Sequence, residues 1–276
     1  MPAAALIALL ALAIPTCAQT LKIARPAISH SEDGPPAENA AVFQPGDILF
    51  FSFQVENYKV GAAGKVQLTG HVAVSDPKGT LIIPGDEEVV GTSISEEDKS
   101  WKPKLRLQIQ IPSFAPPGQY KIKFDVADQQ ARQSAADELA FTVGGKGVAP
   151  AEVLTIRNLA FYRAQEEETS LKLAAYRAGD IVWVRFDAVG YKYGEQNSID
   201  VSYDVTVLSP DGTHLFSQEN AAVEKSQAFY PQPWIPAVFN LTLQSNMRPG
   251  TYKLVIAARD TIGNQTATER ADFRVE

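Results

Sequence analysis

An internal repeat is the feature that most constrains how this chain of 276 residues can fold. The stretch QPGDILFFSFQVENYKVG (44–61) recurs as RAGDIVWVRFDAVGYKYG (177–194). Further along, PPGQYK (116–121) recurs as RPGTYK (248–253). Between these segments the two halves stay in register apart from a single one-residue gap. A match of this length indicates that the chain contains two homologous domains.

The limits of the repeat predict where each domain begins and ends. We place the first domain at residues 19–143 and the second at 153–276, after an N-terminal segment at 1–18. The sequence GGKGVAPAE, in the stretch 144–152, contains Gly, Ala and Pro without apolar periodicity, as linkers do. Because this linker is short, we expect the two domains to stay close to each other.

Each repeat contains about seven segments in which apolar and polar residues alternate, as in half-buried antiparallel strands. LRLQIQI (105–111) is a clear example, and turns such as DPKG (76–79) and SPDG (209–212) separate the segments. The segment 129–140 is rich in helix formers, but its counterpart 261–271 contains a Gly-Thr turn, so we expect hairpin loops at both. This pattern predicts an all-β fold of two tandem immunoglobulin-like antiparallel β-sandwiches.

A tyrosine follows the Pro-Gly turn in both repeats, at Tyr120 and Tyr252. In immunoglobulin-like sandwiches a tyrosine at this place forms a corner in which its hydroxyl bonds nearby backbone. Antibody domains have a disulfide cysteine two residues later, where this chain has Ile122 and Leu254. We therefore expect each sandwich to be stabilised by packing alone.

The order of these motifs resembles a known group of domains. Pro-Gly-Asp, an apolar strand, a Val-x-Asp-Pro-x-Gly hairpin and a Pro-Gly-x-Tyr strand are similar to those of bacterial exported tandem immunoglobulin-like domains of macroglobulin type. The resemblance implies a β-sandwich of the cell envelope. The larger members carry a thioester cysteine or a bait region, and because this chain has neither, inhibitor function is not implied.

The first eighteen residues have the apolar run and small-residue ending of a signal peptide, with cleavage expected after Ala18. Export to the periplasm or the exterior is therefore predicted. Cys17 is the only cysteine, and it leaves open a lipid-anchored form in the outer envelope. No other stretch is apolar for long enough to cross a bilayer, so we expect no transmembrane span in the mature chain.

The residue types that carry chemistry are scattered. The formal charge of −7 and the absence of a Lys and Arg cluster argue against nucleic acid as a partner. His30, His71 and His214 lie far apart in sequence, and no nucleophile elbow, zinc spacing or phosphate loop accompanies them. We therefore expect no catalytic, cofactor-binding or metal site, and a protein that is not an enzyme.

Aromatic residues give the best candidate for a ligand site. FYPQPWIP (229–236) places Phe229, Tyr230 and Trp234 among three prolines, and Tyr191 and Tyr193 lie in a second loop of the same repeat. Trp234 has a counterpart in Trp101, which favours a packing role for both, whereas Phe229 and Tyr230 occur in one repeat only. Exposed aromatic rings bind sugars and peptides, so these five residues are the predicted ligand-binding set.

These observations favour a non-catalytic exported protein that binds or scaffolds in the bacterial cell envelope, with an unidentified protein or glycan partner. One alternative is an accessory module of a polysaccharide-acting hydrolase, which requires Tyr230 and Trp234 to be exposed beside paired carboxylates. Another is a two-domain periplasmic chaperone, which would need a basic anchor between the domains. Arg157 and Lys146, which flank the linker, are the residues available for it.

Overall fold

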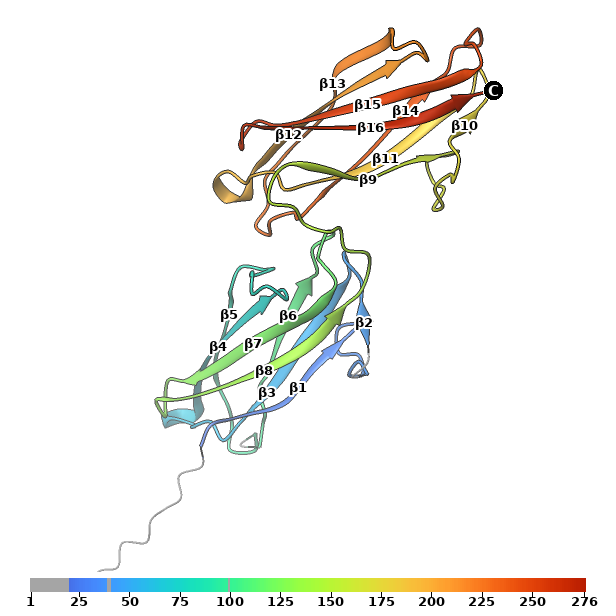
Figure 1. Ribbon diagram of the computed structural model, residues 1–276. Coiled ribbons are helices and arrows are strands. Elements are labelled where there is room, and N and C mark those ends of the chain that lie inside the picture. The colour runs from blue at the N-terminus through green and yellow to red at the C-terminus, as the bar shows by residue number, and fades with distance from the viewer. Residues whose placement is uncertain (1–19, 39–40, 99) are drawn as a thin grey trace, which may run out of the picture.

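The computed structural model describes residues 20–38, 41–98 and 100–276. The predicted signal peptide and Cys17 lie outside these residues. Figure 1 shows two bodies, one above the other, each built from two β-sheets. The only helical elements in the described ranges are two short 3₁₀ turns, η1 (Ala62–Gly64) and η2 (Glu195–Asn197), and none is long or apolar enough to cross a membrane.

The first body is a sandwich of a three-stranded and a five-stranded sheet. The smaller sheet has the order β1 (Lys22–Ser29), β3 (Ile48–Glu56), β6 (Lys104–Gln110). The larger has the order β2 (Val42–Phe43), β8 (Gln133–Val143), β7 (Gly118–Asp128), β4 (Lys65–Ser75), β5 (Asp86–Ser93). All pairings are antiparallel except that of β2 with β8.

The second body repeats this arrangement strand for strand. Its smaller sheet has the order β9 (Thr155–Tyr162), β11 (Ile181–Val189), β14 (Ile235–Thr242). Its larger sheet has the order β10 (Ala175–Tyr176), β16 (Gln265–Val275), β15 (Gly250–Asp260), β12 (Ile199–Leu208), β13 (His214–Ser226). This strand order is that of an immunoglobulin-like sandwich, so the predicted all-β fold is confirmed.

Alternation along the strands builds each core. In β7 and β15 every second residue points inward, and Ile122 and Leu254 are buried at the positions where antibody domains have a cysteine. The tyrosine corners form as expected, because Tyr120 donates its hydroxyl to Pro116 O and Tyr252 donates to Arg248 O, each at 2.8 Å. Each sandwich therefore closes through packing and this corner.

One buried carboxylate anchors the same loops in both domains. Asp128 accepts the amides of Lys59 and Gln130, at 2.7 and 2.8 Å, and Asp260 accepts the amides of Lys192 and Gly263, at 2.8 and 2.9 Å. Both aspartates are 1% exposed. Since a buried N–H without an acceptor is costly, each carboxylate stabilises two loops that have no strand partner.

The segments 129–140 and 261–271, expected as hairpin loops, are mostly strand. Their larger parts belong to β8 and β16, which pair with β7 and β15 over eleven residues each. Most of these side chains are small or polar and at least partly exposed, because β2 and β10 cover only the last residues of β8 and β16, which elsewhere form the edge of the sheet. The ladder is set by main-chain hydrogen bonds, which leave no apolar stripe in the sequence.

Candidate functional site

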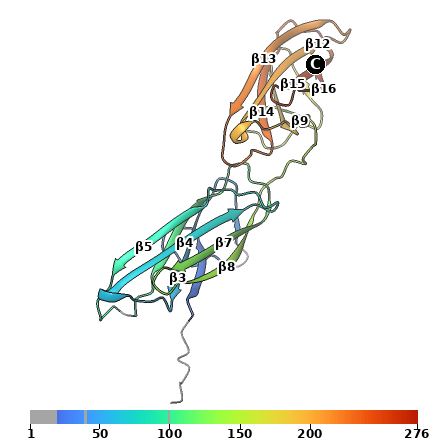
Figure 2. The ribbon, with the colours of Figure 1, turned by 90° about the vertical axis from the view of Figure 1, so that its left-hand side faces the viewer.

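The segment 227–236, which joins β13 to β14 and includes the first two residues of β14, lies at the end of the second domain that faces the first (Figures 1 and 2). Two tyrosines hold this segment, which we name the aromatic loop. The hydroxyls of Tyr191 and Tyr193 both donate to Gln232 O, the second at 2.5 Å. Asn197 Nδ2 donates to Phe229 O at 2.6 Å. These contacts direct Tyr230 and Trp234 away from their own sandwich.

Tyr230 inserts into the first domain. Its side chain is 9% exposed and packs in the apolar cluster that forms the core of that domain. Its hydroxyl donates to Asp76 Oδ2 at 3.0 Å. Burial, followed by the negative charge of Asp76, raises the pKa of the Tyr230 hydroxyl. The hydroxyl therefore remains a donor at neutral pH, and a bond to a carboxylate is stronger than a neutral one.

The turn that opens with Asp76 prepares this acceptor. Asp76 Oδ1 accepts the amides of Lys78 and Thr80, both at 2.8 Å, so one carboxylate oxygen closes the Asp-Pro-Lys-Gly turn. The other oxygen points to Tyr230. Asp76 is 6% exposed, and the two functions of its carboxylate satisfy a charge that would otherwise be costly to bury.

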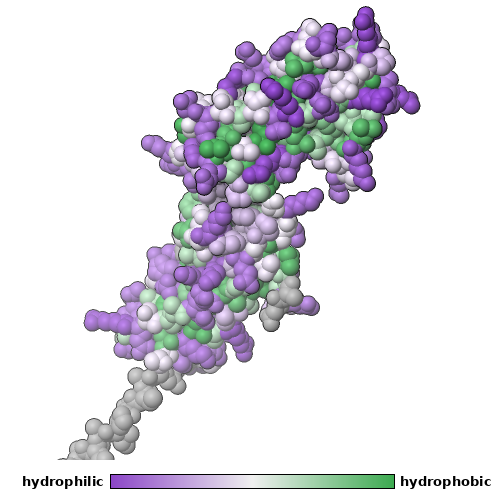
Figure 3. Space-filling view, viewed as in Figure 1, coloured by the Kyte–Doolittle hydropathy of each residue, from purple (hydrophilic) through white to green (hydrophobic). Residues whose placement is uncertain are grey.

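Trp234 makes the second contact between the domains. Its ring lies edge-on to that of Phe114, with 5.7 Å between the ring centroids and 78° between the planes. Phe114 belongs to the loop between β6 and β7 of the first domain. Trp234 is 9% exposed, so most of its surface is covered. The space-filling view shows a surface that is continuous across this junction (Figure 3).

The five residues predicted to bind a ligand thus lie together, at the domain junction. Tyr230, Trp234 and Tyr191 are buried, because the first domain or the aromatic loop covers them, so they do not form an exposed patch; for Trp234 this agrees with the packing role that its counterpart Trp101 favours. Phe229 and Tyr193 remain 51% and 40% exposed at the rim, and their ligand role stays a prediction. Sequence reasoning missed Asp76 and Phe114, whose counterparts in the other repeat, Ser209 and Asn246, are of different chemistry.

The linker is held against the second domain. Arg157 Nη2 donates to Pro150 O at 3.3 Å, and Lys192 Nζ donates to Glu152 O at 3.1 Å. Gly190 has φ +77°, and a Cβ there would lie 2.0 Å from Val153 O. Only glycine allows the linker to approach this closely. Together with the aromatic loop, these contacts fix how the linker enters the second domain.

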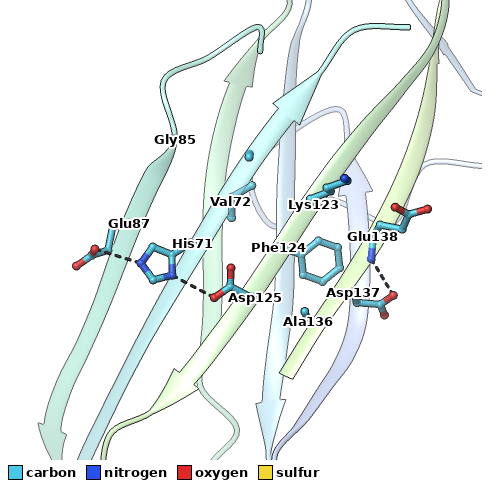
Figure 4. Close-up of a pocket in the computed structure, with 11 residues that line it drawn as sticks. His71, Val72, Gly85, Glu87, Lys123, Phe124, Asp125, Ala136, Asp137 and Glu138 are labelled. Carbon is cyan, nitrogen blue, oxygen red and sulfur yellow. Dashed lines mark hydrogen bonds and ion pairs between the residues drawn. The ribbon is translucent and has the colours of Figure 1, made fainter. Parts of the chain in front are cut away.

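A second cluster of charges lies on the outer face of the large sheet of the first domain. Figure 4 shows His71 on β4 between Glu87 on β5 and Asp125 on β7, with Nε2 to Oε2 at 3.2 Å and Nδ1 to Oδ2 at 3.1 Å. A shallow hollow of about 620 Å³ lies beside them. The hydrogen bond to Asp125 raises the pKa of His71. Lys123 is the other cation lining this hollow.

The chemistry of this hollow is that of a solvated sheet face. In the described part of the chain, no three His, Cys, Asp or Glu side chains gather in a way that could hold a metal ion. His71 is about half exposed, as are both of its carboxylate partners. Its protonation is therefore set by groups that water screens.

Comparison with known proteins identifies no relative by sequence, because neither a sequence family nor a curated protein matches the chain. Among solved structures, the C-terminal domain of the Streptococcus pyogenes antigen I/II-family protein AspA aligns over 91% of this chain and 99% of its own, with 9% identity and a TM-score of 0.33.

Two enzymes also align over part of the chain. A family 123 glycoside hydrolase from Clostridium perfringens aligns over 45% of it, with 11% identity and a TM-score of 0.31. The Pseudomonas fluorescens alkylpurine DNA glycosylase AlkC aligns over 46%, with 10% identity and a TM-score of 0.30. The alignments span 27% and 31% of those two chains. Likenesses at this level carry no inference about what the chain binds or does.

Proposed function

We propose that this chain is a non-catalytic exported protein of the bacterial cell envelope that binds or scaffolds other molecules. The observation that carries the proposal is the junction of Tyr230 with Asp76, through which the aromatic loop joins two sandwiches into one elongated body. A binding protein gains from such an arrangement, because fixed domains present their end loops and sheet edges at a set distance.

The partner is a protein or a glycan of the envelope. Phe229 and Tyr193 are the exposed aromatic residues at the rim of the junction, and they are the first candidates for contact with it. The hydrolase alternative depended on exposure of Tyr230 and Trp234, and the burial of both rings removes that support. The chaperone alternative depended on a basic anchor, but Arg157 donates to the linker carbonyl of Pro150.

The test is capture from envelope extract with the mature chain that begins at Gln19. We expect reproducible capture of a protein or glycan, reduced by Phe229→Ala, a change that leaves the Tyr230 contact in place. The matched control is Leu173→Ala, an exposed apolar residue just before β10 that belongs to neither the junction nor a proposed binding surface. Reproducible turnover of a glycan or peptide by the purified chain would overturn the proposal.

A further inference from the structure

A pocket of about 580 Å³ lies at the free end of the second domain, opposite the junction. Its walls come from the turn at 209–212, the start of β13, the end of β14 and the loop at 244–249. β13 and β14 are edge strands of the two sheets, so the pocket opens between the sheets where no further strand covers them.

The pocket repeats the surface that receives the aromatic loop in the first domain. The register of the duplication places Ser209 on Asp76, Asn246 on Phe114 and Tyr252 on Tyr120. Asp76 and Phe114 are the residues that contact Tyr230 and Trp234. The same position of the same fold thus holds a loop in the first domain and is open in the second.

Apolar side chains that the first domain buries are exposed here. Ile82 is 4% exposed, because the chain turns inward after Ser75 and its amide bonds Val74 O at 2.9 Å. Its counterpart Leu215 is 53% exposed, since β13 starts at His214 and pairs directly with β12. Phe216, beside it, is 40% exposed. Adjacent exposed apolar residues at the rim of a pocket indicate a binding surface.

The chain itself contains a second loop of the kind that fits. The first-domain counterpart of the aromatic loop is 94–103, and we name its described residues, 94–98 and 100–103, the Trp101 loop; they lie at the other free end of the molecule. Trp101 takes the place of Trp234 and is 39% exposed. Tyr58 donates its hydroxyl to Trp101 O at 2.7 Å, as Tyr191 does to Gln232 O, so the backbone at Trp101 is held by the same kind of bond.

The polar groups of the two free ends differ from those of the junction, and a cation in the pocket complements the acidic Trp101 loop. At the junction a donor, Tyr230, meets an acceptor, Asp76. At the free ends the corresponding residues are Glu97, an acceptor, and Ser209, whose hydroxyl donates within its own turn, to Asp211. Arg248 lines the pocket where the first domain has Pro116, and it adds a cation opposite the acidic Trp101 loop.

The pocket also contains Asp211, which has the same charge as the loop. Its carboxylate accepts the Thr213 amide at 3.0 Å and the Ser209 hydroxyl, and the bond from Ser209 keeps the pKa of Asp211 low, at about 2. Asp211 is therefore charged, and its charge is directed into its own turn. Arg248 lines the same pocket and is exposed, so its guanidinium can face an incoming carboxylate.

We propose that this pocket binds the Trp101 loop of a second copy of the chain, with Trp101 seated against Leu215 and Glu97 beside Arg248. The inference rests on the proposed scaffolding function and names its partner. Contact between two different surfaces does not close a dimer, so each added copy presents another pocket and the chains assemble head to tail. Without a linker to raise the local concentration, we expect the contact to be weak and to form at roughly 0.1–1 mM.

Sedimentation velocity of the mature chain over about 10 µM to 1 mM tests this, within the range where a weak contact forms. We expect the mean mass to rise with concentration and to fall again with added salt. Trp101→Ala removes the loop ring, and Leu215→Glu places a negative charge in the pocket. Each should leave a monomer. Val223→Glu, an equally exposed site on β13 outside the pocket, should assemble as the parent does.

Mixing the two variants distinguishes head-to-tail from symmetric contact. The Trp101→Ala chain keeps its pocket and the Leu215→Glu chain keeps its loop, so an equal mixture should form dimers and nothing larger. Glu97→Lys checks the loop without removing the ring, and it should weaken assembly through repulsion by Arg248.

A chain that stays monomeric at 1 mM, or one that assembles despite Trp101→Ala, overturns the proposal. Binding of a synthetic peptide of residues 228–236 by a chain that stays monomeric also overturns it. The pocket would then accept a loop like the aromatic loop, supplied by another protein, and not the Trp101 loop of a second copy. Each of these results leaves capture from envelope extract as a separate measure of the proposed binding function.

Discussion

The two domains share their buried anchors and differ at their ends. Asp128 and Asp260 make matching bonds to loop amides, and both are almost fully buried. Asp76 and Ser209 occupy the same turn position, yet the first is buried under Tyr230 and the second lines an open pocket. A side chain that satisfies the backbone of its own sandwich has the same requirement in both copies. The identity of a residue at the end of a domain instead depends on what packs against that end.

The largest effect should come from removing the shared anchors. Asp128→Ala and Asp260→Ala each leave at least two loop amides without an acceptor, and we expect each to lower the free energy of unfolding of its domain by about 3 kcal/mol. Urea denaturation measures this, and the two values should agree within about 1 kcal/mol. The exposed Glu269→Ala on β16 should change stability by less than about 0.5 kcal/mol. Clearly unequal losses of unfolding free energy for the two variants would contradict the view that the two anchors are equivalent.

Removal of the Tyr230 ring should separate the domains without unfolding them. Tyr230→Ala exposes an apolar site, and we expect a loss of about 2–3 kcal/mol from the junction. Small-angle scattering should then report a wider range of domain orientations, and a protease should cut 144–152 faster. Glu97→Ala, at the corresponding position of the other repeat, should do neither.

Tyr230→Phe separates the ring from its hydroxyl. It retains the packing but leaves Asp76 Oδ2 without its donor, at a cost of about 1–2 kcal/mol. If this variant behaves as Tyr230→Ala does, the hydrogen bond holds the junction and the ring contributes little. If it behaves as the parent does, the ring alone is sufficient.

Gly190→Ala should disturb the linker. The new Cβ would lie 2.0 Å from Val153 O at a positive φ, so we expect a loss of about 2 kcal/mol, visible as a lower Tm and faster proteolysis of the linker. Gly79→Ala is the control, since Gly79 has a similar φ of +88° with nothing within 4 Å of the added atom. Gly79→Ala should cost only the backbone strain of a non-glycine residue at positive φ, about 1 kcal/mol. Equal losses would mean that the linker moves aside freely.

The smallest effect concerns His71, on the outer face of the first domain. Its pKa is raised, first by the hydrogen bond to Asp125, so its contribution to stability is present below the ordinary value of 6.5. That contribution is lost as pH rises through the folded pKa. An NMR titration of the ring should show the raised pKa, and Asp125→Asn should lower it. Because the pair is half exposed, the change in stability should be slight. An unshifted pKa of His71 in the titration would show that the ion pair does not form in solution.

Much of the fold was predictable, because it depends on local signals that are written twice. Alternation placed the strands, and the Pro-Gly-x-Tyr motif placed corners whose bonds the structure confirms. The segments 129–140 and 261–271 were misjudged, since an edge strand held by main-chain pairing leaves no apolar period.

The candidate site was predictable only in part. An aromatic loop that differs between two repeats does signal a specific contact, and it is one. The sequence could not say whether that contact lies within the chain or with another molecule, because both bury the same ring surface. The residue that could have indicated a contact within the chain is Asp76. An acidic residue in one copy and Ser209 in the other indicate that the two ends face different surroundings.

The junction also determines how the molecule responds to tension. The start of β1 and the C-terminus lie at opposite ends of the long axis, so a pull between them passes through the contact of Tyr230 with Asp76 (Figure 1). Once that contact and the linker's bonds to Arg157 and Lys192 open, the eleven residues between β8 and β9 can extend to roughly 36–40 Å. We therefore expect tension to open the junction before it unfolds a sandwich, and the junction can close again without refolding a domain.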